Sequence, residues 1–115
     1  MQISDKGLLK TQAYVDGQWI DADSGETHPV TNPATGETIA EIAKCGTAET
    51  RRAIEAAELA QKRWRQTTAK ERAAILRNWF NLMMQHQEDL AQILTAEQGK
   101  PLAEARGEIP MVPTT

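Results

Sequence analysis

The hydrophobic period of the chain changes at Gly46, and this change decides which secondary structures its two parts can form. Before Gly46, turn-forming residues recur every few positions, so an amphipathic helix does not fit. After Gly46, apolar residues return at steps of three and four, which is the spacing of one helix face. The sequence therefore predicts a β-rich first part followed by helices.

Two β-hairpins are predicted before Gly46. Residues 13–20 hold two short strand-like runs around Asp16-Gly17, a pair that two-residue hairpin turns favour because both positions take positive φ. Residues 29–43 hold two more such runs around the turn sequence of residues 32–36, Asn-Pro-Ala-Thr-Gly.

The first two predicted helices are marked by residues near their N-termini. Thr47 is expected to cap the first helix, with Glu49 in the first turn, where the helix dipole favours an acid. The stretch 53–64 places alanines on one face, which allows another element to approach closely. Thr68 and Glu71 fit a capping box that opens the second helix.

The later helices are bounded by glycine and proline. Residues 87–98 form a third helical stretch, which Gly99 ends because glycine readily takes the left-handed conformation of a C-terminal cap. A fourth helix is expected over residues 101–109, and Pro110 and Pro113 are expected to forbid its continuation. The chain should thus contain two β-hairpins followed by three to four α-helices.

Composition excludes several classes of function. The formal net charge is −3, and the basic residues are mixed with acids, so we expect no nucleic-acid partner. The single cysteine, Cys45, excludes an internal disulfide and a cysteine zinc cluster, and without a nearby histidine it is interpreted as a structural thiol. No apolar run is long enough for a bilayer and no secretory signal is present, so we expect no membrane partner and a cytoplasmic protein.

No set of catalytic side chains converges in the sequence. Gly99-Lys100 resembles the end of a phosphate loop, but Pro101 stands where such a loop needs a hydroxyl residue. The acid pairs Glu88-Asp89 and Glu104-Glu108 are interpreted as solvated helix surface rather than as general acids and bases.

From about Tyr14 to Ile109 the chain resembles the aldehyde dehydrogenase superfamily, most closely its bacterial NAD(P)-dependent succinate-semialdehyde dehydrogenases. The most specific stretch is Glu97 to Ala105, with Gly107-Glu108-Ile109 behind it. The other matching motifs occur in the family's order and spacing, at residues 14–19, 32–37, 53–64, 70–77 and 78–84.

The resemblance implies an α/β, Rossmann-type fold. Residues 1–109 would be the N-terminal part of the NAD(P)-binding domain, and residues 110–115 a tail outside the family pattern, as a truncated gene, a frameshift or an assembly artefact would produce. Full-length members oxidise an aldehyde, here succinate semialdehyde to succinate, through a cysteine thioester and hydride transfer to NAD or NADP. Their catalytic and cofactor residues lie beyond the matched part. We therefore expect the chain alone to bind no cofactor and to be inactive.

The resemblance also implies one metal site. Some family members hold a monovalent cation with backbone carbonyls just before the Asn-Pro turn and an acid just before the Gly-Lys-Pro turn. The matching residues are Val30, Thr31 and Glu97. In the simpler interpretation, Glu97 only caps or solvates the end of a helix.

Two hypotheses about function remain open. In the first, the chain is an N-terminal piece of an aldehyde dehydrogenase, and its apolar helix faces make it homo-oligomeric or self-associating. The alternative is a small helical module that docks on dehydrogenase subunits. Neither the choice of NAD or NADP nor the aldehyde can be predicted from these residues.

Overall fold

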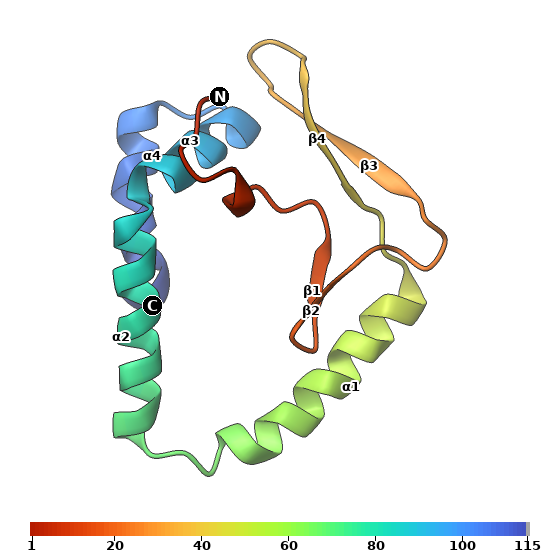
Figure 1. The fold of residues 1–115 in the computed structure, drawn as a ribbon, viewed down its shortest axis with the longest axis vertical. Helices are drawn as coiled ribbons and strands as arrows, with labels where there is room; N and C mark the ends of the chain where they lie inside the picture. Colours follow the sequence, from red (N-terminus) through yellow and green to blue (C-terminus); the bar gives the residue numbers. More distant parts are fainter. Residues whose placement is uncertain (115) are drawn as a thin grey trace. The chain divides into compact units, whose positions relative to one another are not determined.

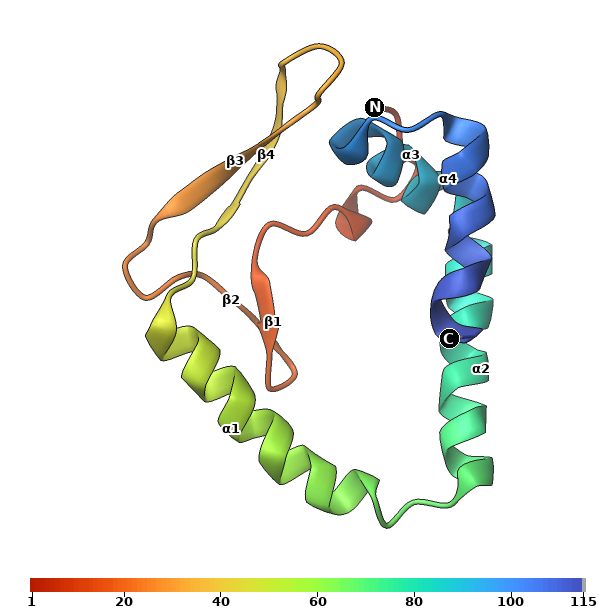
Figure 2. The same ribbon diagram turned by 180° about the vertical axis from the view of Figure 1, so that it is seen from behind.

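The computed structural model describes residues 1–114 and divides into two compact units. Unit 1 combines Met1–Leu9, Thr31–Ile39 and the chain from Ala69 onward, and unit 2 combines Lys10–Val30 with Ala40–Thr68. Figures 1 and 2 show the elements from two sides. In chain order these are η1 (Lys6–Leu8), β1 (Ala13–Val15), β2 (Gln18–Ile20), β3 (Thr27–Thr31), β4 (Thr38–Ala43), α1 (Thr47–Trp64), α2 (Ala69–Gln85), α3 (Gln87–Gln98), α4 (Leu102–Glu108) and η2 (Ile109–Thr114).

The first predicted hairpin is confirmed. Strands β1 and β2 pair antiparallel, with Tyr14 opposite Trp19, and the two rings lie 4.9 Å apart between centroids. Asp16 and Gly17 have φ values of 51° and 74°, so both take the left-handed conformation that this turn requires.

The second predicted hairpin is also confirmed, although β3 begins at Thr27, two residues earlier than the predicted run. Its turn is held by its own polar groups. The Asn32 N–H donates to the Glu37 carbonyl at 2.8 Å, and the Asn32 side-chain oxygen accepts from the Ala34 N–H at 2.9 Å. Such a side-chain bond to the backbone two residues on is typical of asparagine in turns.

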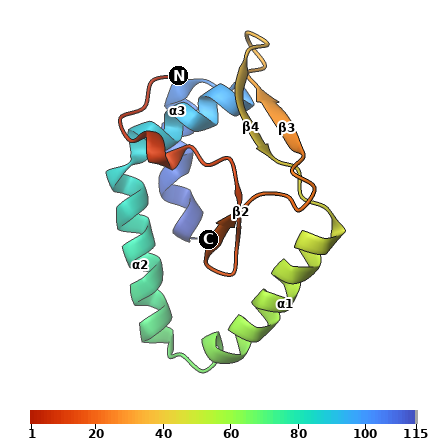
Figure 3. The same cartoon turned by 45° about the vertical axis from the view of Figure 1, so that its right-hand side comes forward.

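Helix α1 begins at Thr47, so the predicted cap at Thr47 is wrong by one residue and Gly46 is the cap. Glycine has no side chain to cap the helix. Glu49 takes part of that role, because its carboxylate accepts the Gly46 N–H at 3.0 Å. The predicted close approach to the alanine face of α1 is confirmed, since Ala53, Ala56, Ala57 and Ala60 line one groove with residues 14–17 of the first hairpin. Figure 3 shows the ribbon of this hairpin beside α1.

Unit 1 has a small core between its helices. Ala91, Ala105 and Ile109 are buried together, and four larger apolar side chains pack partly against them: Met83, Leu90, Leu94 and Leu102. Helix α3 ends as predicted at Gly99, whose φ is 89° and whose N–H donates to the Thr95 carbonyl at 2.9 Å.

The fourth α-helix does not continue past Pro110, as predicted, although a helix of another kind follows it. The α-helix ends at Glu108, but the chain continues as the 3₁₀ helix η2 over Ile109–Thr114. Pro110 lies in the first turn of η2, where its missing N–H removes no hydrogen bond of that helix.

Two buried carboxylates anchor distant backbone, one in each unit. Glu49 and Asp89 are 6% and 8% exposed, and each is the third residue of its helix, α1 or α3. The Glu49 carboxylate accepts the N–H groups of Gly46 and, at 3.4 Å, Asp23. The interpretation of Glu88-Asp89 as solvated surface is therefore wrong for Asp89. Only Glu88 is exposed, and it forms an ion pair with Arg106.

Asp89 binds the start of the chain. Its two carboxylate oxygens accept the N–H groups of Ser4 and Asp5 at 2.7 and 2.8 Å. These two hydrogen bonds favour the charged carboxylate and hold the pKa of Asp89 below its ordinary value of 3.8. The Gly46 N–H lowers the pKa of Glu49 in the same way.

We predict that Asp89→Asn weakens the acid dependence of folding. Because the folded-state pKa is lowered, the stability that this contact provides is present above the unfolded-state pKa and is lost as the pH falls through the folded-state pKa. At neutral pH the variant should melt several degrees lower than the parent. Melting curves followed by circular dichroism should converge as the pH falls from about 5 to about 2. Glu37→Gln, which changes an exposed acid, is the control. If stability falls equally with pH in the parent and in Asp89→Asn, the anchoring role is contradicted.

Gly99 gives a second test, because it combines positive φ with a close neighbour. A Cβ added there would lie 2.8 Å from Cγ of Pro33. Gly99→Ala should lower the free energy of unfolding by more than about 1 kcal/mol. Gly107→Ala is the matched control, because Gly107 lies within α4 with open space around it, and this change should stabilise the chain by about 0.5–1 kcal/mol. Equal effects in chemical denaturation would show that the Gly99 conformation is not required.

Candidate functional site

The predicted cation-binding residues lie near the ends of two elements. Val30 and Thr31 are the last residues of β3, Val30 half-buried and Thr31 exposed. Glu97 is exposed in the last turn of α3. Thr31 and Glu97 belong to the same unit, in which the Pro33 ring lies against Gly99. The turn after Thr31 and the helix end after Glu97 are therefore neighbours.

This arrangement suits a hard cation by the type of its donors. Backbone carbonyls and a carboxylate are oxygen ligands, which hard cations prefer over nitrogen and sulfur ligands. No group of three or more histidine, cysteine or acidic residues that could hold a metal is found in the described part of the chain. Any cation here would therefore depend on backbone oxygens. Binding at Val30, Thr31 and Glu97 stays a prediction.

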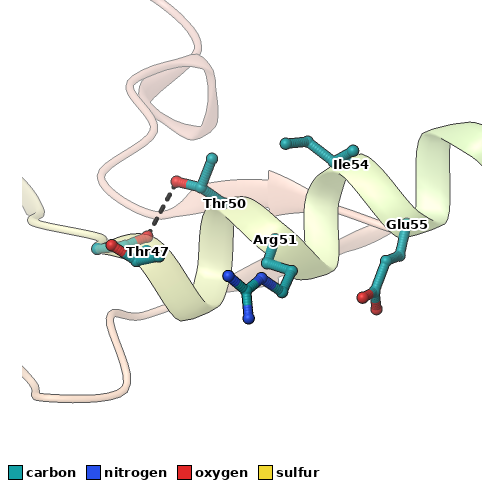
Figure 4. A pocket seen from close by; sticks show the side chains of 6 residues that line it. Thr47, Thr50, Arg51, Ile54 and Glu55 are labelled. Carbon is teal, nitrogen blue, oxygen red and sulfur yellow. Dashed lines mark hydrogen bonds between the residues drawn. The ribbon is translucent and has the colours of Figure 1, made fainter.

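A shallow hollow at the start of α1 brings no reactive groups together. It is lined by one helix and its cap, with Thr47, Thr50, Arg51, Ile54 and Glu55 on its surface (Figure 4). The Thr50 hydroxyl donates to the Gly46 carbonyl at 2.9 Å and so serves the helix end. Ile54 is 63% exposed. The hollow is lined by neither histidine nor cysteine.

Cys45 is half-buried beside a second hollow. Asp23, Lys44 and Glu49 are among the residues that line this hollow, but no histidine is. Asp23 is already engaged with Arg52 through two hydrogen bonds of 2.8 and 2.9 Å, which lower the pKa of Asp23. The thiol thus lacks the partner that nucleophilic catalysis would need.

The remaining charged contacts are surface ion pairs. Arg106 holds Glu88 through two hydrogen bonds of 2.7 and 2.9 Å, and this donor lowers the pKa of Glu88. Lys100, which lies just before α4, forms an ion pair with Glu108 at the C-terminal end of α4. The Arg106 and Glu88 side chains are about half exposed, and pairs of this kind contribute little to stability. Lys100 is more buried than its partner Glu108. These pairs fix helix positions rather than form a site.

The comparisons with known proteins agree with this fold. The sequence pattern of the aldehyde dehydrogenase family matches residues 19–115. The chain is 62% identical to glutarate-semialdehyde dehydrogenase of Pseudomonas putida over 109 residues, which are 95% of this chain and 23% of that protein. It is 58% identical to the NADP⁺ succinate-semialdehyde dehydrogenase GabD of Escherichia coli, with the same shares covered.

Solved structures give the same result. The succinate-semialdehyde dehydrogenase of Burkholderia pseudomallei is 56% identical with a TM-score of 0.93, over 98% of this chain and 23% of that one. Betaine aldehyde dehydrogenase of Staphylococcus aureus, in complex with NAD⁺, is 28% identical with a TM-score of 0.86, over 93% and 22%. The expected α/β fold of the family is thus confirmed.

No helix of the described chain is long and apolar enough to cross a membrane. The chain spans about a quarter of the length of the curated relatives that it matches. Its sequence pattern, its relatives and its fold agree, and so the chain belongs to the aldehyde dehydrogenase family, of whose members it corresponds to an N-terminal part.

Proposed function

We propose that the chain is the N-terminal part of an NAD(P)-dependent dehydrogenase that oxidises succinate semialdehyde, or its homologue glutarate semialdehyde, to the dicarboxylate. The observation that carries this proposal is the identity of 58–62% to enzymes named for these two substrates. A third relative, 58% identical, is named 3-sulfolactaldehyde dehydrogenase. All three names describe small aldehydes with a negatively charged group, which defines the proposed substrate class.

We propose that the residues of this chain do not hold the cofactor. A helix N-terminus binds a pyrophosphate through free backbone N–H groups and a favourable dipole. At the starts of α1 and α3 the buried carboxylates of Glu49 and Asp89 stand instead, and negative charge there repels phosphate. We assign no residue of this chain to NAD(P) and no step of the reaction to it. Its proposed contribution is to the scaffold.

A chimera tests the proposal. Residues 1–109 of this chain would replace the aligned residues of Pseudomonas putida glutarate-semialdehyde dehydrogenase, with the junction after Ile109. We expect the chimera to reduce NAD⁺ or NADP⁺ with both semialdehydes, at a rate within about tenfold of the parent, because nothing that touches the reacting atoms is changed. The readout is absorbance of the reduced nicotinamide.

The isolated chain is the control and should produce no reduced nicotinamide. A folded chimera without activity would contradict the proposal. Binding of the isolated chain to the intact Pseudomonas putida enzyme, together with such an inactive chimera, would favour the alternative, a docking module. The half-exposed apolar side chains of α2 are the observation that keeps this alternative open.

We also propose that the Val30 and Thr31 carbonyls and the Glu97 carboxylate hold a monovalent cation. The proximity of the Pro33 turn to Gly99 supports this proposal. Melting of the chimera should be several degrees higher in potassium or sodium chloride than in choline chloride at equal ionic strength, because binding to the folded state alone stabilises it. Glu97→Gln should remove this difference, whereas Glu104→Gln, an exposed acid on α4, should keep it. An unchanged difference in Glu97→Gln would exclude Glu97 as a ligand.

A further inference from the structure

The turn after β3 and the end of α3 meet where Pro33 lies against Gly99. Both residues belong to unit 1, although they are far apart in the sequence. A Cβ added at Gly99 would lie 2.8 Å from Cγ of Pro33. Because carbon atoms pack at about 3.5–4.0 Å, any side chain at position 99 would push the proline ring away from the helix end.

The turn that carries Pro33 is held in one conformation. The Asn32 carbonyl accepts the Gly36 N–H at 2.7 Å, and the Asn32 N–H donates to the Glu37 carbonyl at 2.8 Å. The proline ring fixes its own φ. The carbonyl of Thr31, two residues before Pro33, therefore keeps its position relative to the ring.

The end of α3 is held as firmly. Gly99 has a φ of 89°, and its N–H donates to the Thr95 carbonyl at 2.9 Å. The next residue, Lys100, is fixed by its ion pair with Glu108. Glu97 lies two residues before Gly99, in the last turn of the helix. Its backbone position is thus fixed relative to Gly99.

We infer that the contact between Gly99 and Pro33 sets the spacing of the Thr31 carbonyl and the Glu97 carboxylate, the two proposed cation ligands that belong to unit 1. A metal site keeps its ligand distances to within about 0.2 Å. A carbon atom placed 2.8 Å from the ring would have to retreat several times as far. Gly99 and Pro33 are therefore positioning residues rather than ligands. This inference rests on the proposed cation site.

A double-mutant cycle separates spacing from backbone strain. Gly99→Ala, Pro33→Ala and the double variant would be made in the chimera with the Pseudomonas putida enzyme. Without Cγ, the nearest remaining side-chain atom of residue 33 is Cβ, which lies 3.8 Å from the added Cβ, an ordinary contact. The double variant thus keeps the strained φ at position 99 but loses the clash.

The readout is the apparent cation affinity, taken from the melting temperature at increasing potassium or sodium chloride, with choline chloride holding the ionic strength constant. Gly99→Ala should weaken this affinity by at least about tenfold, because the two ligands are pushed apart. The double variant should bind within about threefold of the parent while melting at a lower temperature, because the strain at position 99 remains. Gly107→Ala, in α4 with open space around it, is the control and should leave the affinity unchanged.

The outcomes distinguish the inference from the cation site itself. An unchanged affinity in Gly99→Ala would overturn the inference and leave the site intact. An equal loss in Gly99→Ala and in the double variant would also overturn it, because strain rather than spacing would then be the cause. If no cation shifts the melting of the parent chimera, the site and the inference fall together. If Gly99→Ala does not fold, a double variant that binds about tenfold more weakly than the parent would contradict the inference.

Discussion

The fold depends on two carboxylates, Glu49 and Asp89, that are buried at the starts of helices and bind backbone from elsewhere in the chain. Asp89 of α3 binds Ser4 and Asp5, which lie 85 and 84 positions earlier in the sequence. Glu49 of α1 binds Asp23, which lies 26 positions earlier. A hydrogen bond from a backbone N–H to an ionised acceptor is stronger than one between neutral groups. An ionised acceptor at the positive end of a helix dipole satisfies these groups and is itself stabilised there. Each unit is closed by this one kind of contact.

These contacts are needed because the apolar core is small. No large side chain in the described part of the molecule is fully buried, and the most buried residues are mainly alanines. Trp79, Leu82 and their neighbours on α2 stay half-exposed. A family member four times as long has further chain with which such residues can share a core.

The parts that could be predicted from sequence are those that local chemistry determines. Asp16-Gly17 requires a tight turn, and Gly99 ends α3, because few residues other than glycine tolerate positive φ. The role of Asp89 could not be predicted, since its partners lie at the far end of the chain and no periodicity reports them. The cation residues Val30, Thr31 and Glu97 came from the family resemblance alone. Local pattern does not reveal which distant carbonyl lies near which acid.

Amide hydrogen exchange, read residue by residue by NMR, tests the anchoring role of the two carboxylates most directly. Ser4 and Gly46 lie outside regular strands and helices. Amides in such segments ordinarily exchange fast, because local opening costs little free energy there. Held by Asp89 and Glu49, their N–H groups should exchange at least about tenfold more slowly than those of exposed turn residues such as Ser24. Asp89→Asn should remove the protection at Ser4 and Asp5 and leave that at Gly46. Exchange of Ser4 and Gly46 as fast as that of Ser24 would contradict the account.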